Sequence, residues 1–385
     1  MGRQDQAAAE PSDPVAGLAR RTLLRGALAA AAVAGPATAA GFSRDAAAQD
    51  LTFFRIGTGT TGGTYFPIGG IIAGAISNPP GGPPCEIGGS CGVPGLIAVA
   101  QASSGSVENV EKIQAGEIES GLSQADIAFW AYNGTGLYLD EGPLDRLRAI
   151  GRLYAELVHV VVPDDSGIEA IADLAGKRVA LGDLGSGTLI DARLILEAYG
   201  LEEDADYQPV FAGPEAAADL VLADELDAFF IIGGAPLLAV EDLARRMPIR
   251  LLPLADATAR DLLADLPFFT AGRLPAGAYP GVEGVNTLAV GALFVVSSEV
   301  DADLVFGITK ALWHPTTQTL LTHGHPRGRE IRLDNALRGL AIPLHEGATR
   351  YYRDVGMLRR LADERPAEGE AVGPTEATAP QPLTE

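Results

Sequence analysis

Short apolar segments alternate with amphipathic ones along most of the chain. Compact apolar runs predict strands at 53–56, 97–101, 178–181, 227–232, 249–254 and 287–297. Apolar residues at helical spacing predict helices at 66–77, 107–115, 125–132, 189–199, 214–223, 303–313 and 332–340. Several Pro and Gly residues predict an irregular segment at 267–286. A strand that is followed each time by a helix indicates an α/β fold, with a largely parallel sheet and helices on both faces.

The two ends of the chain do not follow this pattern. An Arg-Arg pair at 20–21 precedes a short Ala-rich run, and small residues follow up to Ala48, so residues 1–48 are predicted to be an export signal. The paired arginines favour the twin-arginine route, with cleavage after Ala48, and a general secretory signal or a retained anchor is the alternative. Residues 363–385 are acidic and rich in Pro, Ala and Thr, which predicts a disordered tail.

Export changes the interpretation of the two cysteines. Cys85 and Cys91 lie six residues apart in a Gly- and Pro-rich loop at 78–94. In an oxidising compartment such as the periplasm, we expect them to form a disulfide that stiffens this loop. Two cysteines alone make a poor metal site.

Charge and composition exclude some functions. The chain of 385 residues has a formal net charge of −22 and 47% hydrophobic residues, which is typical of a globular protein that repels nucleic acids. Its length suggests two domains. No segment reaches the roughly 20 apolar residues that a membrane-spanning helix needs.

One motif recurs three times, at places where a predicted strand ends and a helix begins. Gly, Ser and Thr dominate the segments 57–65, 103–109 and 182–188. The first N–H groups of a helix bind anions without any Lys or Arg, Gly allows close approach to the backbone, and hydroxyl groups add donors. Because such turns line a crevice at the carboxyl ends of the strands in open α/β sheets, we expect the three to converge on one small carboxylate.

Each turn also has a simpler explanation. Ser106 could serve only as the N-cap of its helix. The glycines at 57, 59 and 62 match the G-x-G-x-x-G pattern of dinucleotide sites, but no acidic ribose ligand ends a strand about 20 residues further on. A dinucleotide-dependent oxidoreductase therefore stays an alternative, with weak support.

The sequence offers few candidate catalytic or metal-binding residues. His323-Gly324-His325 could bind a metal, yet no Asp, Glu or Cys set lies at a useful spacing, and a solvated loop explains the pair. Asp126 and Asp183 are expected near the crevice, but neither has a partner for acid–base catalysis. The prediction is a protein without catalytic residues, metal or cofactor.

Several motifs together resemble one known family, the TAXI-type solute receptors of tripartite ATP-independent periplasmic (TRAP) transporters. The matching stretches are IGTGTTGGTYFP at 56–67, GSVEN at 105–109, QADI at 124–127, YNGTG at 132–136, SGIEAIADLAGKRVALGDLGSGT at 166–188, DAFFIIG at 227–233 and IPLHEGATRYY at 342–352. The likeness covers about 51–356, although the Cys-containing insertion at 78–94 and the acidic tail fall outside the pattern.

The resemblance implies a two-lobed periplasmic binding protein fold of a type II-like kind, with a parallel or mixed sheet and flanking helices in each lobe. The first lobe would comprise 51–157 and 286–362, and the second 158–285, with crossings near 154–159 and 281–287. It also implies a ligand such as glutamate, glutamine or a dicarboxylate, which the receptor hands to the TRAP membrane permease. We expect a monomer.

The same resemblance implies the residues that hold the ligand. Residues on the first lobe's side would be Thr60, Thr64, Tyr65, Ser106 and Gln124, with Asn109 as a weaker candidate whose simpler explanation is a helix-capping contact. Residues on the second lobe's side would be Ser186, Gly187 and Thr188.

The predicted mechanism is closure of the lobes on the ligand. A periplasmic sensor domain for a membrane kinase could use the same crevice and is the second alternative.

Overall fold

The structure is a computed structural model that describes residues 51–358. The predicted signal at 1–48, with its cleavage after Ala48, and the predicted tail at 363–385 lie outside the described residues, as do residues 359–362 of the predicted first lobe. None of the described helices is both long and apolar enough to cross a lipid bilayer.

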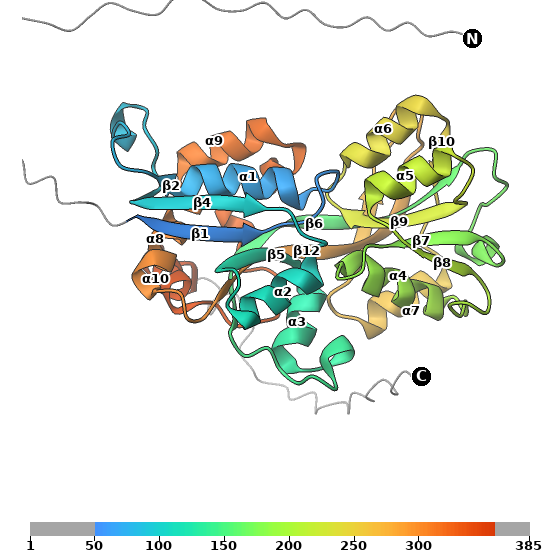
Figure 1. The fold of residues 1–385 in the computed structure, drawn as a ribbon, viewed down its shortest axis with the longest axis horizontal. Helices are drawn as coiled ribbons and strands as arrows, with labels where there is room; N and C mark the ends of the chain where they lie inside the picture. The colour runs from blue at the N-terminus through green and yellow to red at the C-terminus, as the bar shows by residue number, and fades with distance from the viewer. Residues whose placement is uncertain (1–50, 359–385) are drawn as a thin grey trace, which may run out of the picture. The chain divides into compact units, whose positions relative to one another are not determined.

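One mixed sheet of ten strands organises the described chain (Figure 1). Its order is β4-β1-β5-β12-β6-β9-β7-β8, with β10 beside β6 and β11 beside β12. The strands are β1 (Thr52–Gly57), β4 (Leu96–Gln101), β5 (Ser120–Gln124), β6 (Leu147–Pro163), β7 (Arg178–Gly182), β8 (Gln208–Phe211), β9 (Ala228–Gly233), β10 (Ile249–Leu251), β11 (Thr270–Leu274) and β12 (Val285–Ser297). Two short strands, β2 (Ser77–Asn78) and β3 (Val93–Pro94), pair separately.

Two parallel sets of strands are joined by two long antiparallel strands. β4, β1 and β5 run parallel on one side, and β8, β7 and β9 run parallel on the other. Between them, β6 pairs first with β12 and then with β9 and β10. We call the elements around β4-β1-β5 the first lobe and those around β9-β7-β8 the second lobe. The expected crossings near 154–159 and 281–287 fall within β6 and at the start of β12.

Helices cover both lobes, and each parallel strand leads into one (Figure 1). The helices are α1 (Tyr65–Ile76), α2 (Ser106–Ala115), α3 (Ala125–Asn133), α4 (Gly187–Ala198), α5 (Pro214–Leu222), α6 (Leu238–Arg246), α7 (Ala257–Asp265), α8 (Ala302–Leu312), α9 (Pro315–Gly324) and α10 (Glu346–Asp354). One hydrophobic core includes Ile127 of α3, Val160 of β6 and Phe230 of β9, so apolar packing is continuous between the lobes. The prediction of an α/β, two-lobed fold is confirmed.

Two local predictions are wrong. The segment at 332–340 contains only a short 3-10 turn, Leu333–Asn335, because the carbonyl of Ala336 accepts a hydrogen bond from the Arg152 N–H (2.8 Å) instead of closing a helical turn. The segment at 267–286 is not wholly irregular, since β11 pairs with β12 at the edge of the sheet. Four helices, α6, α7, α9 and α10, were not predicted as such.

The predicted disulfide is confirmed. Cys85 and Cys91 are bonded, in the loop that connects β2 to β3. His314 lies near the two sulfur atoms, but sulfurs that are bonded to each other offer no thiolate to a metal ion.

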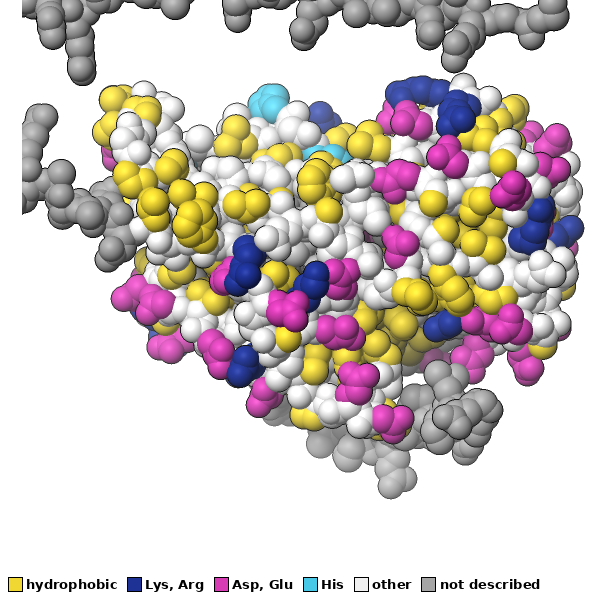
Figure 2. Space-filling view, in the orientation of Figure 1, with side chains coloured by type: hydrophobic (Ala, Val, Ile, Leu, Met, Phe, Trp, Pro, Cys, Tyr) yellow, Lys and Arg dark blue, Asp and Glu magenta, His cyan; other side chains and the backbone are white. Residues whose placement is uncertain are grey.

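Charged side chains are spread over the surface without a basic patch on the visible face (Figure 2). Asp and Glu side chains are scattered there, and Lys and Arg side chains mostly lie beside them. Several of these contacts are exposed ion pairs, such as Arg193 with Glu203 and Arg245 with Glu241. Such pairs contribute little stability but leave few cations without a partner.

Candidate functional site

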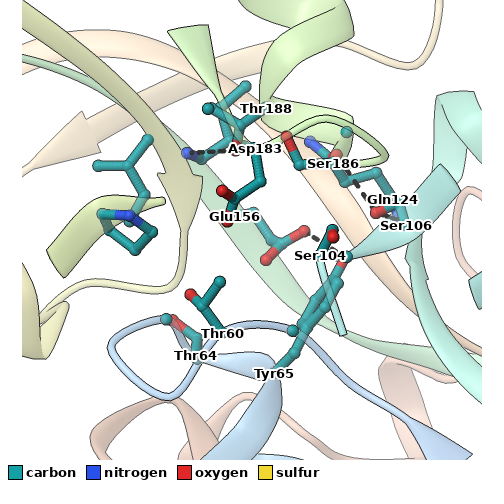
Figure 3. Close-up of a pocket in the computed structure, with 18 of the residues that line it drawn as sticks. Thr60, Thr64, Tyr65, Ser104, Ser106, Gln124, Glu156, Asp183, Ser186 and Thr188 are labelled. Carbon is teal, nitrogen blue, oxygen red and sulfur yellow. Dashed lines mark hydrogen bonds between the residues drawn. The ribbon is translucent and has the colours of Figure 1, made fainter. Parts of the chain in front are cut away.

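The three Gly-Ser-Thr turns meet at one cavity between the lobes (Figure 3). They are the turns from β1 into α1, from β4 into α2 and from β7 into α4. The cavity has a volume of about 70 Å³. Eight of the nine residues expected to bind ligand line it, and these are Thr60, Thr64, Tyr65, Ser106, Gln124, Ser186, Gly187 and Thr188. The start of α5, at Pro214, adds a fourth helix N-terminus; this helix was predicted, but its position at the cavity was not.

The first turn supplies two threonines and a tyrosine. Thr64 is the N-cap of α1, but its hydroxyl donates across the cleft to the Gly234 carbonyl of the second lobe (2.9 Å). The Tyr65 hydroxyl donates to Oε2 of Glu156, on β6 (2.7 Å). The Thr60 side chain also points toward the cavity, and it makes no hydrogen bond with other described side chains or carbonyls (Figure 3). Thr60 is therefore the hydroxyl most available to a ligand.

The second turn contradicts the simpler explanation in which Ser106 serves only as the N-cap of its helix. Gly105 is the N-cap of α2, so Ser106 is the first helical residue and not the cap. Its hydroxyl accepts from the Gln124 backbone N–H (3.0 Å) and donates to the Gln124 side-chain oxygen (3.3 Å). Ser106 thus orients the Gln124 amide at the floor of the cavity.

The third turn belongs to the second lobe and packs against the Gln124 side chain at the floor of the cavity. Ser186 caps α4, because its side chain accepts from the Leu189 N–H (3.1 Å). A Cβ on Gly187 would lie 1.4 Å from the Gln124 side-chain oxygen, so only glycine fits there in this arrangement of the lobes. The Thr188 hydroxyl accepts from the Ile232 N–H of β9 (3.2 Å).

Asn109 is the one expected ligand residue that does not line the cavity. It is fully buried, and its amide donates to the carbonyls of Thr58 (2.7 Å) and Leu122 (2.8 Å). It also accepts from the Ser103 hydroxyl (2.8 Å). Asn109 therefore fixes the first two turns relative to each other, which is a positioning role and not a helix cap.

Direct hydrogen bonds hold the lobes in a closed arrangement. The Glu108 N–H donates to the Gly185 carbonyl (3.0 Å), and the Thr61 hydroxyl donates to the Glu215 carboxylate (3.0 Å). These bonds join the first lobe to the second at opposite rims of the cavity.

Two carboxyl groups line the cavity, and no Lys or Arg is among its described lining residues. Burial raises the pKa of Glu156 to about 8, and the hydrogen bond from Tyr65 opposes this only in part. Burial, and then the nearby Glu215 charge, raises the pKa of Asp183. The groups at the cavity that can attract an anion are the helix N-termini, whose first N–H groups have no partner within their helix.

A pair of buried acids lies beneath the floor of the cavity. Asp126 of α3 and Asp191 of α4 are both fully buried, and the Gln124 amide donates to Oδ2 of Asp191 (2.8 Å). Burial, and then the charge of Asp126, raises the pKa of Asp191 well above its usual range. Burial therefore favours the protonated form of this pair, and Asp191 is the better holder of the proton because Asp126 lies in the first turn of its helix.

Glu156 and Asp191 were not predicted from the sequence. Glu156 did offer a signal, because a lone carboxylate inside the long, nearly continuous buried run of β6 is costly unless it has a function. Asp191 offered none, since acidic residues are common in helices. Asp183 was predicted near the crevice, and it lines the cavity.

The other motifs have structural explanations. A Cβ on Gly57 would lie 2.4 Å from the Asn109 side-chain oxygen, so this glycine of the G-x-G-x-x-G match serves close packing. His323 contacts the Thr319 carbonyl within its own helix, and His325 caps the following turn. No metal cluster of His, Asp or Glu forms around the histidine pair within residues 51–358.

Comparisons with solved structures find weak likenesses to two sulfonate-binding proteins and to a putative L-cystine ABC transporter. The alkanesulfonate-binding protein SsuA from Xanthomonas axonopodis pv. citri, bound to MOPS, is 15% identical over 79% of this chain and 84% of that chain, with a TM-score of 0.43. The periplasmic aliphatic sulphonate binding protein SsuA from Escherichia coli is 16% identical over 82% and 95%, with a TM-score of 0.38. A putative L-cystine ABC transporter from Listeria monocytogenes is 13% identical over 74% and 98%, with a TM-score of 0.41.

The match to a family model shows which protein family the chain belongs to. The model of the NMT1-like family matches residues 56–356, a range that begins in β1 and contains all four helix N-termini at the cavity. The match thus covers both lobes and most of the chain. The protein belongs to the NMT1-like family.

Proposed function

We propose that the protein is an extracytoplasmic solute receptor that captures a small carboxylate by closure of its two lobes. The observation that carries the proposal is the convergence of four helix N-termini and several hydroxyl groups on a cavity without Lys or Arg among its described lining residues. Helix N–H dipoles bind a carboxylate without a formal positive charge, and more strongly where the protein surrounds the ligand and less water competes with them. The negative net charge of the chain gives an anionic ligand no help from a distance.

The two acidic groups at the cavity favour a ligand that carries an ammonium group beside its carboxylate. Asp183 lines the same cavity as the helix N-termini, and it can accept hydrogen bonds from an ammonium group. Glu156, with its pKa raised to about 8, is protonated at neutral pH and adds no charge that would repel the carboxylate. We therefore favour an α-amino acid such as glutamate or glutamine over a dicarboxylate of similar size.

The proposal also includes a membrane permease as partner and the periplasm as compartment. The likeness of the motifs to TAXI-type receptors supports delivery to a TRAP membrane permease, and the signal-like residues 1–48 support a periplasmic location. The disulfide between Cys85 and Cys91 is consistent with an oxidising compartment.

Calorimetry with a panel of ligands tests the proposal. We expect glutamate or glutamine to bind more tightly than 2-oxoglutarate and glutarate, which lack the ammonium group. Thr60→Val should weaken binding about 5- to 10-fold, since it removes one hydrogen bond of about 1 kcal/mol, whereas Thr319→Val on the exposed side of α9 should not. If no carboxylate binds more tightly than about 100 µM, a carboxylate receptor is ruled out.

A further inference from the structure

A second cavity, of about 250 Å³, lies on the other side of the junction between the lobes. It shares no lining residue with the cleft, although Ala125, the neighbour of Gln124, lines it. Its walls come from α3 of the first lobe, from the long strands β6 and β12, and from the segment between α7 and β11 of the second lobe. In Figure 2, hydrophobic side chains gather in a recess between the surfaces over α3 and α7.

Two aromatic rings form its apolar wall. Phe129 of α3 and Phe268 of the second lobe lie with ring centroids 5.6 Å apart, and Phe268 also meets the edge of Trp130 (5.3 Å). Both phenylalanines are half-buried, so each keeps part of its surface open to the cavity. Pro267 and Leu340 extend this surface.

One cation, Arg152 of β6, enters this cavity, where Thr270 is the other polar side chain among the described lining residues. Its guanidinium packs over Gly291 of β12, where a Cβ would lie 3.3 Å from its Nε. Arg152 is half-buried, yet within residues 51–358 its guanidinium has no hydrogen bond, ion pair or aromatic partner. A half-buried cation without a partner is unusual, because desolvation is then uncompensated.

The charged neighbours compensate the desolvation of Arg152 only in part. Glu330 is the nearby acid, but its carboxylate already pairs with Arg327 and accepts from the Ala155 N–H (3.3 Å). Arg338, a second cation, is also near. Arg152 is the one charged residue among the described residues that line this cavity, in a chain whose formal net charge is −22.

We propose that this second cavity binds a small organic monoanion with an apolar body, such as an aromatic carboxylate. The five N–H donors of Arg152 would hold the anionic head, and the ring would lie against Phe129 and Phe268. A dry cavity of about 150 Å³ accommodates benzene, so a cavity of 250 Å³ has room for a larger ring with its carboxylate. Because its walls belong to both lobes, an occupant stabilises the arrangement in which Phe268 contacts Phe129.

Calorimetry with naphthalene-2-carboxylate, and with its neutral carboxamide as the matched control ligand, tests this site in the full-length protein. We expect saturable binding of the carboxylate. Arg152→Met should weaken carboxylate binding about 10- to 100-fold, the range for losing a charge-assisted hydrogen bond, and change carboxamide binding less than about 3-fold. Arg148→Met, on the same strand but outside the cavity, should change neither.

A second variant covers the case in which Arg152→Met does not fold. Phe268→Ala should weaken binding of the carboxylate and the carboxamide alike, because both use the aromatic wall. Thr60→Val in the cleft should leave both unchanged, so the test is independent of the proposed function. Absence of saturable carboxylate binding to the wild type up to about 1 mM, or equal carboxylate affinities for wild type and Arg152→Met, would overturn the proposal.

Discussion

Replacement of Glu156 by Gln should change how the stability of the protein depends on pH. Glu156 is 2% exposed, and its carboxyl accepts a hydrogen bond from the Tyr65 hydroxyl (2.7 Å). Gln has almost the same shape and still offers an oxygen to Tyr65, but it cannot ionise. The substitution therefore removes the titration and leaves the packing nearly intact.

The magnitude follows from the pKa of Glu156, which burial raises from 4.5 to about 8. Below pH 4.5, the folded and unfolded chains both hold the proton, and the stabilisation by this group is complete. As the pH rises toward 8, the unfolded chain releases the proton first, so the free energy of unfolding falls. At about 1.36 kcal/mol per pKa unit, the fall amounts to roughly 4 to 5 kcal/mol.

Urea denaturation at pH 5, 6, 7, 8 and 9, followed by tryptophan fluorescence, measures this effect. We expect wild type and Glu156→Gln to be similar at pH 5, and the variant to be more stable by roughly 4 kcal/mol at pH 9. In a chain of this size, that difference corresponds to about 6 °C in Tm. Glu117→Gln, at an exposed position of the first lobe, controls for the loss of one negative charge. Unfolding free energies that stay parallel from pH 5 to 9 for wild type and Glu156→Gln would refute the reasoning.

Three further predictions concern closure, the junction of the turns and the loop. Gly187→Ala places a methyl group 1.4 Å from the Gln124 side-chain oxygen, so ligand affinity in calorimetry should fall at least about 10-fold; unchanged affinity would contradict the closed arrangement. Asn109→Ala removes three hydrogen bonds, two to the carbonyls of Thr58 and Leu122 and one from the Ser103 hydroxyl, and should cost about 2 to 4 kcal/mol in urea denaturation; a cost under about 1 kcal/mol would exclude the positioning role. Joint replacement of Cys85 and Cys91 by Ser should cost about 2 kcal/mol, because the closed loop is short, while calorimetric ligand affinity stays unchanged; a large loss of affinity would show that the loop belongs to the site.

The parts of the site that lie in one continuous turn could be predicted from the sequence. Gly187 and Thr188 follow a buried strand after a short turn, and local geometry alone then places them at a helix N-terminus. Ser106 and Asn109 of the same GSVEN stretch are both buried, but only Ser106 lines the cavity, and no sequence pattern encodes that difference.

The parts formed by distant segments could not be predicted. Asp126 and Asp191 meet only because the long strands β6 and β12 carry the chain from one lobe to the other. The expected helix at 332–340 failed for a similar reason, because β6 uses the Ala336 carbonyl through the Arg152 N–H. In both cases a long-range contact overrides local preference.

A crystal structure of the protein with the small molecule that it retains through purification tests the central claim most directly. We predict a carboxylate within hydrogen-bonding distance of the first N–H groups of α2 and α4 and near the Thr60 hydroxyl, with its charge balanced by no Lys or Arg. A retained ligand that lies outside the residues around Ser106 and Gly187, or whose anionic group contacts an arginine or lysine side chain, would contradict it.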